Sequence, residues 1–311
     1  MDPDDSNLEG APEVVHWKAE LFVAAAGELT ECPRWDERSA RLLWVDIYEG
    51  TLNSCDAAGG DRTSMSAGQP LGSFAPRTEG GYVLALETGL ALSGHDISAW
   101  SPVGPQRGLP SVVRSNEGSC DPYGRFFAGT MAHDEASHGG ELLRLDAPTA
   151  ERPAPVPEQV IPRTTVSNGI GWSADGSRAY YIDSAERRVD VFDYDGSTGA
   201  MTDRRPFVSF QPSDGYPDGL TVDADDHLWV AFWGGAAVRR FTPDGRLAGI
   251  VDVPVPRVSS CTFGGDDLGE LFITTARYQL TAEEFAEYPL SGSIFRCRPG
   301  PVGRPVRRYA G

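Results

Sequence analysis

Six short apolar runs recur along this chain at intervals of about 40 to 50 residues, and they constrain its fold more than any other feature. The runs begin at residues 41, 82, 125, 178, 227 and 270, where the sequence reads RLLWVDI, YVLALE, RFFAGTM, RAYYIDS, HLWVAFW and ELFITTA. A polar turn precedes each run, and a second strand-like segment follows most of them. Six such units, each long enough for four short strands, predict an all-β chain folded as a six-bladed β-propeller.

The first residues of the chain are predicted to lie outside the folded domain, and both ends of that domain are predicted to close the ring. Residues 1–14 are acidic and polar, and we expect them to form a disordered tail ahead of a single propeller domain over residues 15–311. Short apolar stretches lie near both ends of that domain, LFVAAAG over 21–27 and RPVRRYAG over 304–311. We expect these stretches to complete the ring, with strands from the two ends sharing one blade, because such closure removes an exposed sheet edge.

The net charge of the chain limits which partners it can bind, and its cysteines indicate the cellular compartment. The formal net charge is −18 at pH 7, so we expect no nucleic-acid partner. This charge disfavours anionic substrates and suits cations or, as we expect here, a small neutral substrate. The five cysteines are scattered without a CxxC pair, which predicts reduced thiols rather than a disulfide framework. The N-terminal residues lack the basic and apolar regions of a signal peptide, and no run of 18 apolar residues occurs. We therefore expect a cytoplasmic protein, without a membrane partner, that is a monomer or a weak homo-oligomer.

Carboxylates and amides recur at one position, about nine or ten residues upstream of four of the apolar runs. This position holds Glu31, Asn116, Asn168 and Asp218, while the other two units offer Ser73 and either Ser259 or Ser260. In a propeller this register lies on the innermost strand of each blade, so the repeat would gather these side chains around the axis.

The chemistry of the four polar residues points to a metal site on the central axis. Carboxylate and amide oxygens are hard ligands, which suit Ca²⁺, Mg²⁺ or Mn²⁺ better than a thiolate zinc site would. Two carboxylates in one confined pocket also need a cation or a proton to compensate their charges. The alternative is that polar residues merely line a wet central channel.

Several ordered segments resemble the senescence-marker-protein/gluconolactonase/regucalcin-like family, from about residue 17 to the last residue. They are ECPRW (31–35), CDPYGRFFAGTM (120–131), VSNGIGWSADG (166–176), PDGLTVDADDHLWVAFWGG (217–235), SSCTFGG (259–265) and the final YAG. The resemblance implies a six-bladed propeller with one divalent metal ion, either Ca²⁺, Mg²⁺, Mn²⁺ or Zn²⁺. By position it implies Glu31, Asn168 and Asp218 as metal ligands and Arg114 and Asn116 as substrate contacts.

Two local departures from the family pattern bear on the substrate. Where the family often has an Asn-Asp-Gly-Lys run, residues 116–119 of this chain read Asn-Glu-Gly-Ser. The loop after the GTM strand reads AHDEASHGG (132–140) and looks shortened. A carboxylate from this loop contacts substrate in some members, so Asp134, or alternatively Glu135, is the candidate for that contact here.

These observations predict metal-dependent hydrolysis of a sugar lactone, an aldonolactone such as gluconolactone or a pentonolactone, to the free sugar acid. In this hypothesis the metal polarises the lactone carbonyl, and Asp218 is the general base for an attacking water. Two alternatives remain open at this point. One is a related propeller esterase or phosphotriesterase with the same oxygen-rich site, and the other is a non-enzymatic calcium-binding propeller.

Overall fold

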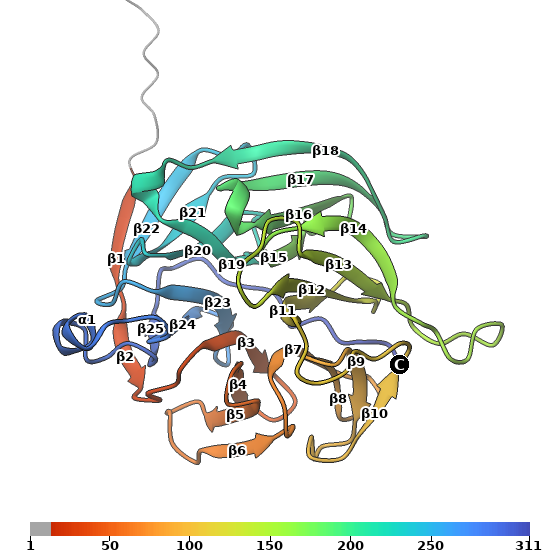
Figure 1. Cartoon of the computed structure of the whole chain (residues 1–311). Helices are drawn as coiled ribbons and strands as arrows, with labels where there is room; N and C mark the ends of the chain where they lie inside the picture. The colour runs from red at the N-terminus through yellow and green to blue at the C-terminus, as the bar shows by residue number, and fades with distance from the viewer. Residues whose placement is uncertain (1–13) are drawn as a thin grey trace, which may run out of the picture.

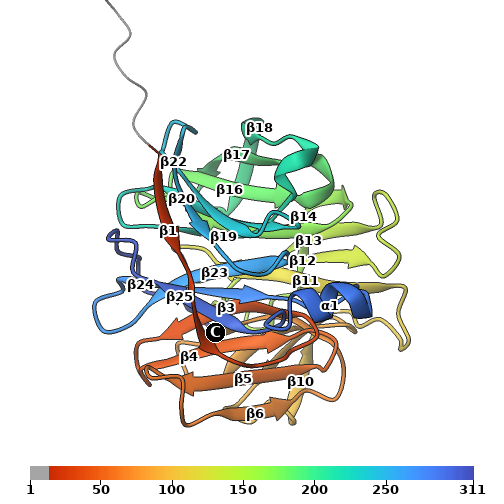
Figure 2. The same cartoon turned by 90° about the vertical axis from the view of Figure 1, so that its left-hand side faces the viewer.

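The computed structural model describes residues 14–311 and arranges their strands as six sheets around one axis (Figure 1). The predicted disordered tail of residues 1–14 lies outside the described residues except for Val14. Each sheet is a blade of the all-β six-bladed propeller that the repeat predicts, and Figure 2 shows the same blades from the side. Among residues 14–311, no helix is both long and apolar enough to cross a membrane.

In each blade the strands follow one another from the axis outward. The innermost strands are β3 (Thr30–Asp36), β7 (Leu71–Pro76), β11 (Val113–Cys120), β15 (Ser167–Trp172), β19 (Tyr216–Val222) and β23 (Val258–Gly264). The second strands are β4 (Arg41–Asp46), β8 (Tyr82–Leu86), β12 (Phe126–Ala132), β16 (Arg178–Asp183), β20 (Leu228–Trp233) and β24 (Glu270–Thr275). The third strands are β5 (Thr51–Asp56), β9 (Leu90–Ser93), β13 (Gly140–Leu145), β17 (Arg188–Asp195), β21 (Ala237–Phe241) and β25 (Ile294–Cys297).

The remaining elements lie at the edges of the sheets or in the connections. The fourth strands are β6 (Thr63–Ser66), β10 (Trp100–Val103), β14 (Glu158–Thr164), β18 (Ala200–Ser209), β22 (Leu247–Asp252) and β2 (Glu20–Val23). One further strand, β1 (Val15–Lys18), pairs in parallel with β22. The helical segments are the 3₁₀ turns η1 (Ser184–Glu186) and η2 (Pro212–Asp214) and the short helix α1 (Ala282–Glu287).

The apolar runs form the second strand of every blade, and the segments upstream of them form the innermost strands, as predicted. Each innermost strand has a register irregularity near its start. Asn116, Asn168 and Asp218 lie within these irregularities, and Glu31 directly precedes one. A β-bulge re-aims side chains out of the regular alternation, which is how consecutive positions here can turn toward the axis.

The ring is closed by a strand from the N-terminal part of the chain. β2 pairs antiparallel with β25, so strands from the two ends of the chain share the last blade, as predicted. The prediction that residues 304–311 supply a strand to the ring is wrong. Pro299, Pro301 and Pro305 follow β25, and a proline has no N–H to donate to a strand ladder.

The segment 302–311 instead crosses the middle of the ring at the far ends of the innermost strands (dark blue in Figure 1). Tyr309 is 1% exposed and donates its hydroxyl hydrogen to the Asp146 carbonyl at 3.0 Å. The segment contacts all six blades. The contacts are Val302 with Ala224, Gly303 with Leu268, Arg304 with Trp172, Arg308 with Asp36, Tyr309 with Pro76 and Ala310 with Gly124. The segment therefore holds together blades that are distant in sequence.

Aromatic side chains fill the space between neighbouring blades. Trp35 of β3 stacks on Phe272 of β24 with ring centroids 5.8 Å apart, and Trp229 of β20 meets Phe263 of β23 edge-on at 5.4 Å. All four side chains are buried, and each buried side chain of phenylalanine size contributes about 1.5–3 kcal/mol to folding. Trp35 and Trp229 thus belong to the core between neighbouring blades.

Candidate active site at the open end of the axis

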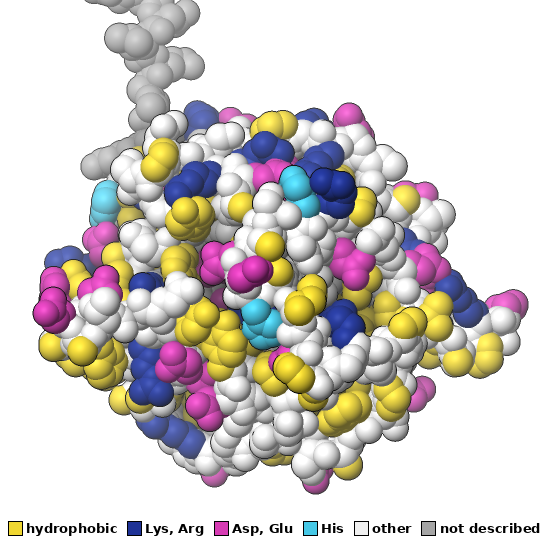
Figure 3. Space-filling view, in the orientation of Figure 1, with side chains coloured by type: hydrophobic (Ala, Val, Ile, Leu, Met, Phe, Trp, Pro, Cys, Tyr) yellow, Lys and Arg dark blue, Asp and Glu magenta, His cyan; other side chains and the backbone are white. Residues whose placement is uncertain are grey.

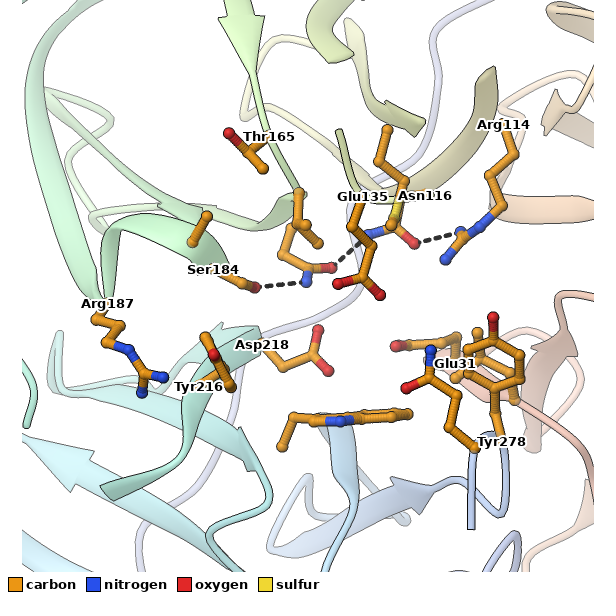
Figure 4. A pocket seen from close by; sticks show the side chains of 17 residues that line it. Glu31, Arg114, Asn116, Glu135, Thr165, Ser184, Arg187, Tyr216, Asp218 and Tyr278 are labelled. Atoms are coloured by element: carbon orange, nitrogen blue, oxygen red, sulfur yellow. Dashed lines mark hydrogen bonds between the residues drawn. The ribbon is translucent and has the colours of Figure 1, made fainter. Parts of the chain in front are cut away.

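A cavity of about 400 Å³ lies at the starts of the innermost strands (Figure 4). Its wall includes Glu31 of β3, Arg114 and Asn116 of β11, Asn168 of β15 and Asp218 of β19. These five residues come from four blades and span almost two hundred positions of the sequence. The structure therefore brings together every predicted site residue except Asp134.

A chain of hydrogen bonds links the polar residues on one side of this cavity (Figure 4). Arg114 Nη1 donates to Asn116 Oδ1 at 2.6 Å, and Asn116 Nδ2 donates to Asn168 Oδ1 at 2.7 Å. Asn168 Nδ2 donates to Ser184 Oγ at 2.8 Å, and Ser184 Oγ donates to the Pro217 carbonyl at 2.6 Å. Because arginine can only donate and a carbonyl can only accept, the two ends of the chain fix the orientation of both amides.

The two carboxylates stand apart from this chain. Asp218 is 5% exposed and its Oδ1 has no hydrogen-bond partner within residues 14–311, while Glu31 is 4% exposed and accepts from the Cys32 N–H at 3.2 Å. Burial raises the pKa of Asp218 well above its usual range, and the charges of Glu31 and Glu117 raise it further. Burial and the Glu117 charge raise the pKa of Glu31 in the same way. The nearby Arg114 guanidinium lowers both pKa values in part, yet ionising both carboxylates at once remains costly in this buried setting.

The donor atoms fit a hard divalent cation. An unpartnered buried carboxylate oxygen such as Asp218 Oδ1 is costly unless a proton or cation satisfies it. Asn168 Oδ1 accepts one hydrogen bond, from Asn116, so its second lone pair is free for a ligand. Within the described part of the chain no three His, Cys, Asp or Glu side chains gather as a metal cluster. A cation at this position would therefore rely on two carboxylates and neutral oxygens.

A second polar layer lies deeper on the axis. Neither Ser73 nor Ser259 or Ser260 lines the cavity. Ser260 Oγ instead donates to Glu117 at 3.0 Å, and Glu117 Oε2 and Ser73 Oγ have no partner in the described structure. Burial raises the pKa of Glu117 to about 7. In the sequence the run that contains Glu117 differs from the family pattern, but only the structure places its side chain beneath the site.

Of the two carboxylates predicted from the loop after β12, Glu135 lines the cavity and Asp134 does not. Asp134 does not line the cavity, because its Oδ1 accepts a hydrogen bond from the Ala136 N–H at 3.1 Å in a local turn. Its neighbour Glu135 does line the cavity and has a positive φ of 55°. The turn at Asp134 and the left-handed backbone at Glu135 decide which carboxylate faces inward, and neither can be inferred from residue type alone.

The rim of the cavity holds residues that the sequence patterns did not single out. They are Ser184, Arg187, Tyr216, Tyr278 and Gln279. Ser184 is the last residue of the predicted run RAYYIDS, and it directly follows the observed strand β16. Its place at the end of a blade strand was the one available signal. Trp233, the last residue of β20, also lines the cavity.

The sequence of this chain matches a known protein family. Residues 29–277 match the family described as SMP-30/Gluconolactonase/LRE-like region. The chain belongs to this family. This SMP-30/gluconolactonase-like chain is 34% identical to regucalcin of Danio rerio over 300 residues, which cover 94% of this chain and 99% of that protein. It is 35% identical to 6-deoxy-6-sulfogluconolactonase of Pseudomonas putida over 290 residues, which cover 91% of this chain and 95% of the relative.

Solved structures agree with the fold. The crystal structure of regucalcin, a calcium-binding protein from Agrobacterium tumefaciens, matches this chain with a TM-score of 0.89 at 24% identity. The match covers 97% of this chain and 100% of that structure. Together with the family assignment, this likeness confirms the six-bladed propeller and the family resemblance seen in the sequence.

Proposed function

We propose that this protein hydrolyses a sugar lactone to the free sugar acid in a reaction that depends on one divalent metal ion. The observation that carries the proposal is the pair of buried carboxylates, Glu31 and Asp218, in the wall of a cavity that also holds a fixed arginine. Ester hydrolysis needs a base, a centre of positive charge and oriented donors, and this cavity offers all three. The relationship to a 6-deoxy-6-sulfogluconolactonase supports a sugar lactone as the substrate.

In this proposal Glu31, Asn168 and Asp218 would hold the ion, whether Ca²⁺, Mg²⁺, Mn²⁺ or Zn²⁺, and a bound ion supplies Lewis-acid polarisation of the lactone carbonyl. Asp218 is the proposed general base, because its Oδ1 has no hydrogen-bond partner among the described residues and can accept a proton from water. Glu31 accepts from the Cys32 N–H, so its role is mainly to hold the ion.

The substrate contacts follow from the hydrogen bonds that are already made. Arg114 uses Nη1 for Asn116 and the Ser115 carbonyl, while its Nε has no partner among residues 14–311. Both N–H groups of Asn116 are used, on Asn168 and the Ser167 carbonyl, so towards a sugar it can only accept, through Oδ1. We assign the remaining carboxylate contact to Glu135 in preference to Asp134, because Glu135 lines the cavity.

A substrate screen tests the proposal. Chelated protein is supplied with each of the four metal ions and assayed for acid release over a panel of aldonolactones, with phosphotriesters and simple esters as the comparison set. The proposal predicts metal-dependent turnover of at least one lactone that exceeds turnover of every compound in the comparison set. Faster turnover of a phosphotriester or simple ester would identify a related propeller esterase. Metal binding without turnover of any compound would identify a non-enzymatic binding protein.

A further inference from the structure

One wall of the cavity pairs aromatic rings with a guanidinium. Tyr216 and Trp233 face each other across β19 and β20, and both line the cavity. Arg187, from the connection between β16 and β17, places its guanidinium carbon 3.7 Å from the centroid of the Tyr216 ring. Arg187 Nη1 also donates to the Gly215 carbonyl at 3.0 Å. The guanidinium is therefore held in place by one neutral acceptor and one aromatic face.

Arg187 keeps a positive charge without an acidic partner. Glu186, the adjacent carboxylate, pairs with Arg188 and with Arg204 instead, and no carboxylate of residues 14–311 forms an ion pair with Arg187. Its backbone has a positive φ of 49° as the C-cap of the η1 turn, where its N–H donates to the Ser184 carbonyl at 3.1 Å. This turn sets the point from which the side chain extends over the Tyr216 ring.

We propose that Arg187 binds an acidic group on the substrate, a phosphate, sulfonate or carboxylate remote from the lactone carbonyl. This inference rests on the proposed lactone hydrolysis. The planar guanidinium has five N–H donors that match the oxygens of such groups, and one donor is engaged by Gly215. Arg187 and Arg114 lie on opposite sides of the cavity (Figure 4), so a substrate with its carbonyl near Arg114 and Asp218 can extend its far end toward Arg187.

The charges around the cavity favour this orientation. Glu135 comes from the loop after β12, on a different blade from Arg187, and it would repel an acidic group placed beside it. The net charge of −18 favours a neutral substrate when taken alone. On the face drawn in Figure 3, however, acidic and basic side chains are interspersed. The local field at Arg187 can therefore outweigh the average charge of the molecule, because distant surface charges are screened by salt.

Matched substrates test the inference. The ratio kcat/KM is measured for D-gluconolactone and for its counterparts with a phosphate, a sulfonate or a carboxylate at carbon 6, using wild-type protein, Arg187→Gln and Arg187→Lys. We expect the wild type to prefer at least one charged lactone, which identifies the acidic group. Arg187→Gln should raise KM for that lactone about tenfold or more beyond any rise in KM that it causes for the neutral lactone. Arg187→Lys should give an intermediate value. Equal losses on the charged and neutral lactones, or no loss on either, would overturn the inference.

Two further measurements separate this inference from the proposed function. Arg246→Gln removes the same charge at a side chain that is 62% exposed and paired with Asp244, and it should leave both classes of lactone unaffected. Calorimetric binding of gluconate, and of its counterparts with a phosphate, a sulfonate or a carboxylate at carbon 6, to metal-loaded protein requires no turnover. If no lactone is hydrolysed but one of these carbon-6 acids binds more tightly than gluconate in an Arg187-dependent way, the acidic-group site stands and the hydrolase proposal fails. If none of the three carbon-6 acids binds more tightly than gluconate, the acidic-group site is wrong.

Discussion

The two ends of the innermost strands differ in what covers them. At their starts, Glu31, Asn168 and Asp218 face a cavity of about 400 Å³. At their far ends the space shrinks to about 100 Å³, and the segment 302–311 lies across it. Both ends carry charged side chains, but at the far end Arg34 donates to the Pro33 carbonyl at 3.0 Å and Arg304 pairs with Asp226 at 2.7 Å.

The same six strands therefore form the candidate active site at one end and contacts that close the ring at the other. The open end leaves a buried carboxylate oxygen of Asp218 without a partner, which weakens the metal-free fold and suits ligand binding. At the far end the polar groups form hydrogen bonds and ion pairs that link segment 302–311 to the blades, and these contacts stabilise the ring. We therefore expect changes at the open end to act on turnover and metal binding, and changes at the far end to act on stability alone.

The largest expected effect is at the open end. Asp218→Asn keeps an oxygen of nearly the same shape but removes the base, so turnover of the best lactone should fall roughly 10²-fold or more. The loss should persist when metal is saturating, because excess metal cannot replace a missing base. Initial rates of acid release at rising metal concentration measure this. Near-normal turnover of Asp218→Asn at high metal would show that Asp218 is only a ligand.

Removing the metal should weaken the fold, and more so at higher pH. The folded pKa values of Glu31 and Asp218 are raised, so the stability that these two groups contribute to metal-free protein is fully present only below about pH 4, where both are protonated in either state. That stability is lost as the pH rises through the raised folded pKa values, because the folded state must then lose protons that it binds tightly.

A bound cation removes this penalty and adds about 2.7 kcal/mol when it is present at about 100 times its Kd. Melting temperatures with chelator and with metal should therefore differ more at pH 8 than at pH 5. An equal melting temperature in a sample shown to have lost its metal would count against a cation between the two carboxylates.

A change at the far end should lower the free energy of unfolding and leave activity unchanged. Tyr309→Phe removes the hydrogen bond to the Asp146 carbonyl and should lower the free energy of unfolding by about 1 kcal/mol. Denaturant titration measures that loss, and kcat and metal affinity measured well below the melting temperature should stay at wild-type values. A matching fall in kcat would show that the two ends are coupled.

The smallest expected effect is that of thiol modification. All five cysteines are free and buried, including Cys32 beside Glu31 and Cys120 on β11. Burial raises the pKa of Cys55 to about 11 and of Cys297 to about 12, so reactive thiolate is scarce at neutral pH. Native protein treated with a thiol reagent should keep most of its activity. Complete loss after modification of one cysteine, with metal still bound, would assign that thiol a role in the reaction.

The sequence predicted those parts of the molecule that repeat. The spacing of the apolar runs predicted the blades, and the shared register of Glu31, Asn116, Asn168 and Asp218 predicted the residues that meet in the cavity, because every blade places the same strand position at the axis. Residues outside the repeat were not predictable in this way. Glu135 and Arg187 reach the cavity through left-handed backbone at φ 55° and 49°, and apolar periodicity carries no information about such local geometry.

The path of the C-terminal segment was missed for a related reason. Tyr309 is buried by contacts to two other blades, and its short apolar stretch is equally compatible with a closing strand. The prolines before it were the available signal against a strand, since they interrupt any ladder after β25. The far end of the axis therefore had to be seen in the structure.

The most direct test of the account is the metal dependence of lactone hydrolysis in Asn168→Ala. This variant removes a neutral oxygen ligand and leaves Glu31 and Asp218 in place. Initial rates are measured for chelated wild type and variant while one divalent ion is added back. The account predicts no turnover without metal and saturation of the wild type at a single site. It also predicts that the variant needs more metal but regains at least part of its activity. Full turnover of chelated protein, or a loss in Asn168→Ala that no amount of metal restores, would contradict a metal site at the open end of the axis.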